Sequence, residues 1–366
     1  MIFLQTDGFG YLSDLLDRTN ETRATDLHIC VGERPLCRVN GALRPIDDTV
    51  ITPPLAAAVV SALLDADQRE RLARERVVDF SFSRPGVGRF RVNVYSQRGT
   101  FAAAIRRLPF DIPAFSELGL PGAVLSFTGR TKGLILATGA TGSGKSTTLA
   151  SLLDAINSRH NRHIITIEDP IEYLHKHKKS LVTQREIGAD ALSFPQALRS
   201  ALREDPDVIM VGEMRDMETI SIALTAAETG HLVLSTLHTV GAAKSIDRIL
   251  DAFPPAAQAQ VRSQLATVLE GIVSQMLLPR LDGGGLIAAC EVMTVNTAVR
   301  NLIREGKHYQ INSVIQTGAA QGMTMMEDSL ARLIKSGAIS AEDASLHAPD
   351  PALLSKLLGG NNTKTI

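Results

Sequence analysis

The chain has 366 residues, of which 44% are hydrophobic and 21% are charged, and its 38 basic and 39 acidic residues leave a formal net charge of −1. This length favours two or three domains with a sizeable hydrophobic core. The balanced charge, the lack of Trp and the aromatic content of 4% argue against bulk nucleic-acid binding and against stacking platforms for single strands.

Three cysteines, Cys30, Cys37 and Cys290, are too scattered for a disulfide framework or a zinc knuckle, and no C-x-x-C pair occurs. This cysteine usage fits a reducing compartment, so we expect a cytoplasmic protein. No apolar run reaches the roughly 18 residues of a membrane-spanning helix, so any membrane contact is expected to be peripheral.

Residues 1–112 have the pattern of a small α/β module. A helix is expected to begin near Tyr11, and an Asn40-Gly41 turn predicts a hairpin within residues 36–45. A helical stretch is expected from Thr52 to about Arg76. The expected strands outside the hairpin are 26–31, 77–82, 88–95 and 100–108.

Prolines punctuate the next segment, and we interpret residues 113–125 as a linker. From about residue 126 to residue 366, strand patterns first alternate with helix patterns, which predicts a parallel sheet with right-handed crossovers. The expected strands are 133–138, 163–168, 207–212 and 231–236, with helices near 146–158, 194–204 and 216–228.

Beyond residue 240 the pattern is mostly helical. We therefore expect the second domain, 126–366, to end in a helical C-terminal region at about 290–366. The helices expected after residue 240 are 242–250, 256–276, 297–305, 311–317, 325–336 and 341–346.

The most informative stretch follows the strand at 133–138. Gly139-Ala-Thr-Gly-Ser-Gly-Lys-Ser146 fills every place of the phosphate-loop pattern G-x-x-x-x-G-K-[ST]. Its glycines permit positive φ, so that backbone N–H groups turn inward around phosphates, and the following helix points its positive dipole end at the same anion. Lys145 is expected to reach the β- and γ-phosphates, and the Ser146 hydroxyl to bind Mg²⁺. The expected nucleotide-binding residues here are Gly139, Ala140, Thr141, Gly142, Ser143, Gly144, Lys145, Ser146 and Thr147.

Acidic residues follow two other predicted strands. Glu213 comes directly after an apolar run that ends at Gly212, where a Mg²⁺-binding or water-orienting carboxylate is expected. Glu168, Asp169 and Glu172 follow the strand at 163–168. Three carboxylates so close together need a cation such as Mg²⁺ or Arg, and one of them, with Glu168 and Glu172 as our candidates, can take a proton from the attacking water.

Two histidines bracket the strand-like run between residues 231 and 238. Because seven residues separate His231 from His238, their side chains face opposite sides of a strand, which argues against one shared metal. A structural role stays open for each. His238 is also placed to hydrogen-bond a γ-phosphate and to sense its loss, and His231 is counted with the nucleotide-binding residues.

Basic residues gather on or beside the last two strands of the first module. They form either a solvated basic face or arginine fingers that stabilise transition-state charge at the nucleotide of a neighbouring subunit. Among them we favour Arg98 and Arg106 as catalytic. The full set is Arg89, Arg91, Arg98, Arg106 and Arg107.

Taken in order, these motifs resemble those of the secretion and type IV pilus ATPases, and most of all the PilT-type pilus retraction branch. Residues 139–146 match the family's Walker A motif, and 167–172 match its aspartate box. Residues 202–216 match its Walker B signature, and 229–238 match its histidine box. Similarity at 24–28 and 88–93 extends the resemblance over nearly the whole chain.

Two features favour the retraction branch. Ala298-Val-Arg-Asn-Leu-Ile-Arg-Glu305 is similar to the branch motif Ala-Ile-Arg-Asn-Leu-Ile-Arg-Glu, with Val299 in place of Ile. The four-cysteine zinc motif of many assembly and type II secretion ATPases is absent from the sequence. The resemblance implies a PAS-like N-terminal α/β domain, a RecA-like P-loop domain with a helical C-terminal region, and a ring of six subunits that binds ATP and Mg²⁺.

The expected function is a hexameric ATP-hydrolysing motor that drives type IV pilus retraction, and so twitching motility, by nucleotide-dependent domain rotation. The resemblance implies the cytoplasmic face of the inner membrane, with a membrane platform protein and the pilus machinery as partners and no nucleic acid. The alternatives are a PilU-like accessory ATPase and a type II or type IV secretion ATPase. From other classes, a nucleotide-gated scaffold with little hydrolysis and a nucleic-acid translocase are also considered.

Overall fold

The computed structural model describes residues 7–39, 41–84, 86–109 and 111–359. The chain forms two compact units. The first comprises Met1–Asp111 with Pro170–Leu174, and the second comprises Ile112–Asp169 with His175–Ile366. The segment expected as a linker, 113–125, therefore belongs to the second unit, where it contains a 3₁₀ helix and the short helix α4.

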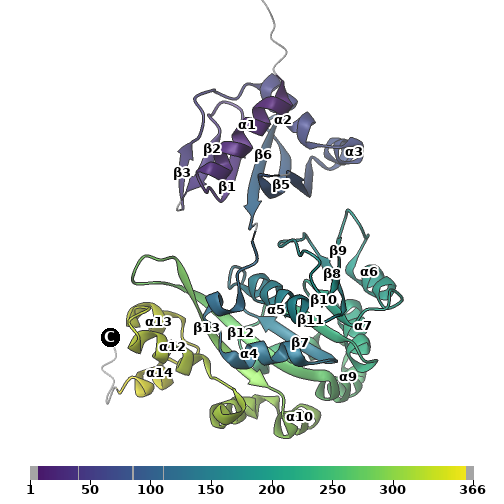
Figure 1. The fold of residues 1–366 in the computed structure, drawn as a ribbon, viewed down its shortest axis with the longest axis vertical. Coiled ribbons are helices and arrows are strands. Elements are labelled where there is room, and N and C mark those ends of the chain that lie inside the picture. Colours follow the sequence, from purple (N-terminus) through teal and green to yellow (C-terminus); the bar gives the residue numbers. More distant parts are fainter. Residues whose placement is uncertain (1–6, 40, 85, 110, 360–366) are drawn as a thin grey trace, which may run out of the picture. The chain divides into compact units, whose positions relative to one another are not determined.

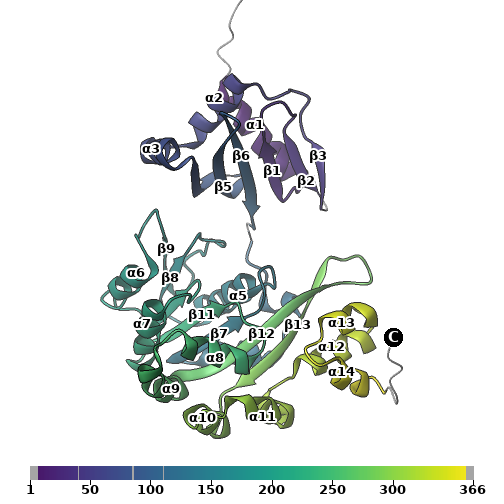
Figure 2. The same cartoon turned by 180° about the vertical axis from the view of Figure 1, so that it is seen from behind.

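The first unit is built on an antiparallel sheet of six strands in the order β3-β2-β1-β6-β5-β4 (Figures 1 and 2). Helices α1 and α2 contact each other and share one core with the sheet. Phe90, Val92 and Val94 alternate along β5 toward this core, as expected of a strand with one buried face. The elements are α1 (Gly8–Glu21), β1 (Asp26–Ile29), β2 (Leu36–Val39), β3 (Ala42–Pro45), α2 (Pro53–Leu63), α3 (Ala66–Glu75), β4 (Val77–Arg84), β5 (Gly88–Gln97) and β6 (Thr100–Leu108).

The single helix predicted from Thr52 to Arg76 is wrong, because this stretch forms two helices, α2 and α3. Leu64 adopts an extended backbone and ends α2. Asp65 and Gln68 then form a capping box at the start of α3, in which each side chain accepts a hydrogen bond from the other residue's backbone N–H. The predicted hairpin forms as β2 and β3, and Asn40 of its turn lies outside the described residues.

The second unit contains a seven-stranded sheet in the order β13-β12-β7-β11-β10-β8-β9. Neighbouring strands are parallel except for β13, which runs antiparallel to β12. The elements through the sheet are α4 (Gly122–Ser126), β7 (Gly133–Thr138), α5 (Lys145–Arg159), β8 (His163–Glu168), β9 (Leu181–Glu186), α6 (Phe194–Ala201), β10 (Val208–Val211), α7 (Met217–Glu228), β11 (Leu232–Leu237), α8 (Ala242–Asp251), α9 (Pro255–Val268), β12 (Leu269–Pro279) and β13 (Leu286–Thr294).

Helices cover both faces of this sheet (Figures 1 and 2). Along β7, Leu134 and Leu136 pack into a cluster with residues of α6 to α9, whereas Ile135 and Ala137 pack with residues of α4 and α5. A strand buried on both faces is a continuous apolar run in the sequence. This local signature explains why the bounds predicted for β7 and β8 agree with the structure.

Two predictions for the second unit are wrong. The helix predicted over 256–276 ends at Val268, and the chain continues as strand β12. Strand β13 pairs with β12, so the sheet extends into the part of the sequence that was expected to be mostly helical. Strand β9 at the opposite edge was not predicted either.

Helices α10 to α14 form the helical C-terminal region that was expected. Asn296 caps α10 by accepting a hydrogen bond from the backbone N–H of Val299 at 3.0 Å. In the described part of the chain, no helix is both long and apolar enough to cross a membrane. The bounds are α10 (Thr297–Arg304), α11 (Ile311–Thr317), α12 (Met326–Lys335), α13 (Ala341–His347) and α14 (Pro351–Leu357), of which α14 was not predicted.

Candidate nucleotide-binding site

The phosphate loop joins β7 to α5 in the second unit. Gly139, Gly142 and Gly144 have φ values of +143°, +79° and +87°, which L-residues with side chains rarely adopt. Helix α5 begins at Lys145, whose ammonium group donates hydrogen bonds to the carbonyls of Gly139 at 2.8 Å and Ala140 at 2.9 Å. The loop therefore has the backbone conformation that the sequence pattern requires. The Lys145 side chain is bound to carbonyl groups of the same loop.

Gln275 on β12 supports this loop from a distant part of the sequence. It is 3% exposed, donates from Nε2 to the carbonyl of Ser143 at 2.7 Å, and accepts from the Thr148 hydroxyl at 2.9 Å. This residue was not predicted, because the stretch around it was expected to be helical. The sequence feature that could have identified it is a polar glutamine, between Ser274 and Met276, in a run rich in apolar residues.

The loop glycines are required by packing as well as by φ. A Cβ at Gly139 would lie 2.3 Å from the carbonyl oxygen of Gln275, and one at Gly144 would lie 2.9 Å from its side-chain nitrogen. Gly142 has no such neighbour within 4 Å. The hydroxyl oxygen of Ser143 is buried with no hydrogen-bond partner among the described residues. A tight backbone cradle with an unsatisfied polar atom fits a bound phosphate.

A second group of side chains lies at the same sheet edge, where β10 and β11 end. Glu213 forms an ion pair with Arg215, Oε2 to Nε at 2.6 Å, and its Oε2 lies 3.4 Å from Nε2 of His238. Nδ1 of the same histidine lies 3.5 Å from the Thr141 hydroxyl of the phosphate loop. His238 therefore lies between the phosphate loop and Glu213, the acidic residue that follows β10. Arg215 was not predicted as a site residue, although it follows Glu213 by two residues.

Glu168 ends β8 and is 8% exposed. Its Oε1 accepts hydrogen bonds from the Thr166 hydroxyl at 2.7 Å and from the Gln184 amide at 3.2 Å. Because β8 is parallel to β10, Glu168 lies at the sheet edge that carries Glu213. Glu172 belongs to the segment Pro170–Leu174 of the first unit, so the second unit does not itself bring it to the phosphate loop.

His231 lies at the opposite end of its strand from the phosphate loop. It directly precedes Leu232, which pairs with Gly133 at the start of β7, whereas the loop follows Thr138 at the end of β7. Its Nδ1 lies 2.9 Å from the carbonyl of Ala226 and 3.3 Å from the Thr229 hydroxyl. The placement of His231 beside the nucleotide-binding residues of its own subunit is therefore corrected, because the length of β11 separates it from them.

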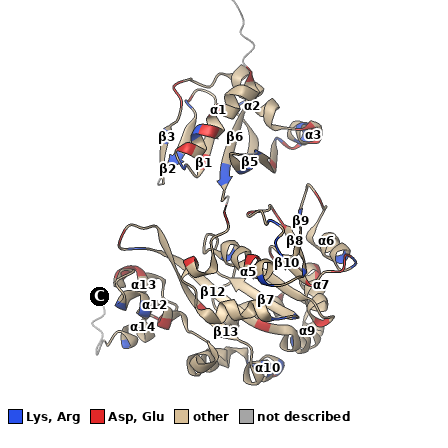
Figure 3. Cartoon of the chain, in the orientation of Figure 1, with Lys and Arg blue, Asp and Glu red and all other residues tan. Residues whose placement is uncertain are grey.

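The two favoured arginines belong to the first unit. Arg106 is at the basic end of β6 (Figure 3), and its Nε donates to Oδ1 of Asp26 at 2.8 Å. Burial raises the pKa of Asp26, but the hydrogen bonds from Arg106 and Thr25 outweigh burial and lower it overall. Arg98 is exposed in the turn between β5 and β6, with a positive φ of 49°.

A phosphate loop between β7 and α5, supported from β12 and faced by a strand-end glutamate and histidine, defines a P-loop nucleoside triphosphatase. Residues 11–345 match the family model described as Type II/IV secretion system protein. The chain belongs to this family, binds nucleotide and is an ATPase.

Characterised relatives share most of their length with the chain. It is 47% identical over 340 residues to the type IV pilus retraction ATPase PilT of Pseudomonas aeruginosa, covering 93% of this chain and 98% of that one. It is 48% identical over 321 residues to a twitching motility protein of Neisseria gonorrhoeae, covering 88% and 86% of the two chains.

A crystal structure of the pilus retraction motor PilT with bound ADP is similar to the chain, with a TM-score of 0.89 at 50% identity over 94% of this chain and 98% of that one. This likeness confirms the predicted fold class, a PAS-like α/β domain followed by a RecA-like domain with a helical C-terminal region. The bound ADP of that structure also supports nucleotide binding by this chain.

Proposed function

We propose that the chain is a ring-forming motor ATPase that drives type IV pilus retraction, and with it twitching motility. The observation that carries the proposal is the contact chain from Thr141 of the phosphate loop through His238 to Glu213, within a family whose similar members are named for this activity. The proposed working form is a homohexamer at the cytoplasmic face of the inner membrane, bound to a membrane platform protein of the pilus machinery.

The residues at the phosphate loop fit a nucleotide together with Mg²⁺. Lys145 and the inward N–H groups bind the β- and γ-phosphates, and the Ser146 hydroxyl with the Glu213 carboxylate would hold Mg²⁺. Within the described residues, no group of three or more His, Cys, Asp or Glu side chains is arranged to hold a metal ion. Two protein oxygen ligands are compatible with Mg²⁺, because it keeps several waters and takes its other ligands from substrate phosphates. When bound, it neutralises charge that develops on the phosphates.

Glu213 is also placed to orient the attacking water, since it stands at the sheet edge beside the loop. Glu168 and Glu172 are the proposed acceptors of the water's proton, and their roles are separable by Glu168→Gln and Glu172→Gln in single-turnover hydrolysis. Arg98 and Arg106 are the proposed arginine fingers toward a neighbouring subunit's nucleotide. Arg106 uses its Nε for Asp26, and the remaining N–H groups of its guanidinium are the proposed donors to a phosphate oxygen.

His238 is the proposed sensor of the γ-phosphate. Its ring lies beside Thr141 of the phosphate loop and beside Glu213 at the end of β10. Loss of the γ-phosphate therefore alters both contacts at once. This change is proposed to drive rotation of one domain against the other, a hinge motion controlled by γ-phosphate contacts.

The proposal is tested by deleting the gene in its host and restoring it as wild type or as Glu213→Gln. A retraction motor predicts abundant unretracted pili and no twitching in the deletion, with rescue by the wild type alone. Retained twitching in the deletion would instead favour a PilU-like accessory ATPase, and defective secretion with normal pili would favour a secretion ATPase. ATP hydrolysis that requires DNA would favour a translocase.

A further inference from the structure

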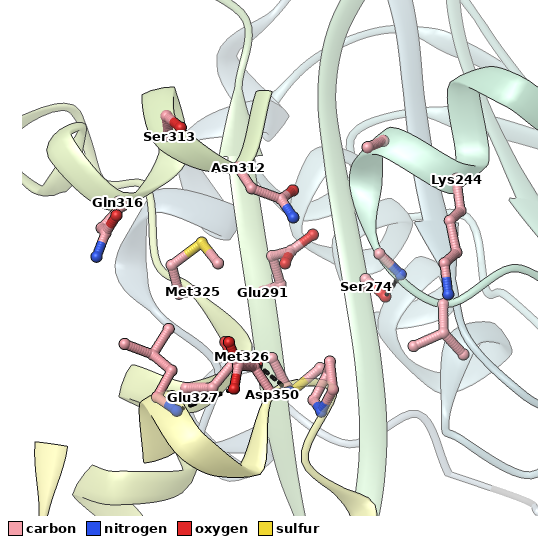
Figure 4. Close-up of a pocket in the computed structure, with 15 residues that line it drawn as sticks. Lys244, Ser274, Glu291, Asn312, Ser313, Gln316, Met325, Met326, Glu327 and Asp350 are labelled. Carbon is pink, nitrogen blue, oxygen red and sulfur yellow. Dashed lines mark hydrogen bonds between the residues drawn. The ribbon is translucent and has the colours of Figure 1, made fainter. Parts of the chain in front are cut away.

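A cavity of about 390 Å³ lies in the second unit, and none of the residues assigned to nucleotide binding lines it. Its walls come from the start of α8, from β12 and β13, and from helices α11, α12 and α14 (Figure 4). A volume of this size is in the range of small-molecule sites. The lining residues used below are Lys244, Ser274, Glu291, Met325, Glu327 and Leu353.

Two buried carboxylates line this cavity. Glu291 on β13 is 6% exposed, and Glu327 on α12 is 2% exposed. Oε1 of Glu291 accepts from the backbone N–H of Ala242 at 2.7 Å, and Oε1 of Glu327 accepts from that of Asp350 at 2.9 Å. Oε2 of Glu327 is buried and has no hydrogen-bond partner among the described residues. A carboxylate oxygen buried in this way is costly unless a ligand supplies a donor.

The charges around the cavity favour a cationic donor. Burial raises the pKa of Glu291, and the negative charge of Glu327 raises it further, against the opposing effect of the Ala242 N–H. The two carboxylates therefore repel each other in a poorly solvated place. Lys244 is the one Lys or Arg side chain among the lining residues, and it is exposed. A positive charge bound between the two glutamates relieves both the repulsion and the missing hydrogen bond.

The apolar side chains in the lining favour an organic cation over a metal ion. Figure 4 shows Glu291 and the thioether of Met325 among the side chains that line the cavity. Leu353 adds a further apolar side chain. We propose that the cavity binds a small organic ammonium ion, with the ammonium group between Glu291 and Glu327 and a short aliphatic chain against Met325 and Leu353.

The proposed site is joined to the phosphate loop by neighbouring residues of β12. The hydroxyl oxygen of Ser274, which lines the cavity, accepts from the backbone N–H of Gly241 at 2.8 Å. The next residue, Gln275, faces the other way and holds the loop at Ser143. The cavity is thus separated from the nucleotide site by the thickness of one strand.

The test is calorimetric titration of the full chain, free of nucleotide, with 1,4-diaminobutane. Saturable binding at one site is expected in the wild type. Because a buried charge-assisted hydrogen bond is lost, Glu327→Gln and Glu291→Gln are each expected to weaken binding roughly 10-fold or more. Glu342→Gln makes the same chemical change at an exposed position of α13 and is expected to bind like the wild type. Thermal unfolding of each variant shows whether it is folded.

A third variant tests the sign of the charge. Lys244→Gln removes the exposed cation at the cavity and is expected to tighten diamine binding about two-fold. The proposal is overturned if 1,4-diaminobutane fails to bind the wild type, or if folded Glu327→Gln binds it equally well. It is also overturned if Mg²⁺ alone binds at this site, with loss in Glu327→Gln, while the diamine does not.

Discussion

The phosphate loop and the acidic cavity lie on opposite sides of β12 and differ in how their polar groups are satisfied. At the loop, Gln275 uses its amide nitrogen and its amide oxygen within the protein, and one buried atom without a partner among the described residues is the neutral hydroxyl of Ser143. At the cavity, the corresponding atom is a carboxylate oxygen of Glu327. Each place therefore leaves a buried polar atom for a ligand, a neutral hydroxyl at the phosphate loop and a carboxylate oxygen at the cavity.

The largest effect is expected where the loop touches β12. Gly139→Ala places a methyl group against the backbone of Gln275 and forces an unfavourable φ, together a cost of at least about 3 kcal/mol, or roughly 100-fold in ADP affinity. Gly142→Ala shares the φ strain but meets no neighbour within 4 Å. Equilibrium binding of ADP should therefore rank Gly139→Ala well below Gly142→Ala, and equal losses would show that the contact with β12 does not matter.

The support from β12 is tested next. Gln275→Ala removes two buried hydrogen bonds to the loop region and is expected to cost about 2 to 3 kcal/mol of loop stability, seen as a loss of ADP affinity of roughly 30- to 150-fold. Gln260→Ala, at an exposed position of α9, is the matched control. If both variants bind ADP like the wild type, the loop does not depend on β12.

We expect acid to lower the free energy of unfolding through His175, which lies in the segment after β8. Burial lowers the pKa of His175 to about 4, from an ordinary value of 6.5. As the pH falls, the His175 imidazole is therefore protonated in the unfolded chain before it is protonated in the folded chain. The free energy of unfolding keeps its full value above pH 6.5 and decreases by about 2 to 3 kcal/mol as the pH falls from 6.5 toward 4. Denaturant unfolding across this range should show the slope in the wild type and in exposed His347→Gln. A slope that persists unchanged in His175→Gln would refute the assignment.

The smallest effect concerns the C-terminal region. Asn296→Ala removes the cap of α10 and is expected to lower the free energy of unfolding by about 1 kcal/mol without changing ADP affinity. Urea denaturation and nucleotide binding on the same sample measure the two quantities. A loss of ADP affinity in this variant would mean that α10 and the phosphate loop are more closely coupled than their contacts indicate.

Much of the nucleotide site could be predicted because its residues are close together in sequence. The phosphate-loop pattern, the apolar run of β7 and the strand-end position of Glu213 each have a local signature. His238 was also placed correctly at this edge. The error at His231 arose because a motif groups residues by sequence, whereas a strand separates its two ends in space.

The support for the loop could not be predicted in the same way. Strand β12 follows α9 without a break, since the helix ends at Val268 and the strand begins at Leu269 with apolar residues that would also suit a helix. Gly271 is the sequence feature that could have indicated a strand here. A Cβ at this position would lie 2.1 Å from the ring of Phe127, so the close packing of this strand requires glycine. The acidic cavity, likewise, gathers residues from helices and strands more than a hundred positions apart.

The central claim is that the described site hydrolyses ATP without nucleic acid, as part of a ring. It is tested most directly by measuring ATPase activity and native mass on the same purified samples of wild type, Lys145→Ala and Glu213→Gln. We expect DNA-independent hydrolysis by a hexamer, and a loss of activity of at least about 100-fold in both variants. A wild-type chain that binds ATP with Mg²⁺ but neither hydrolyses it nor assembles would contradict the motor and favour a nucleotide-gated scaffold.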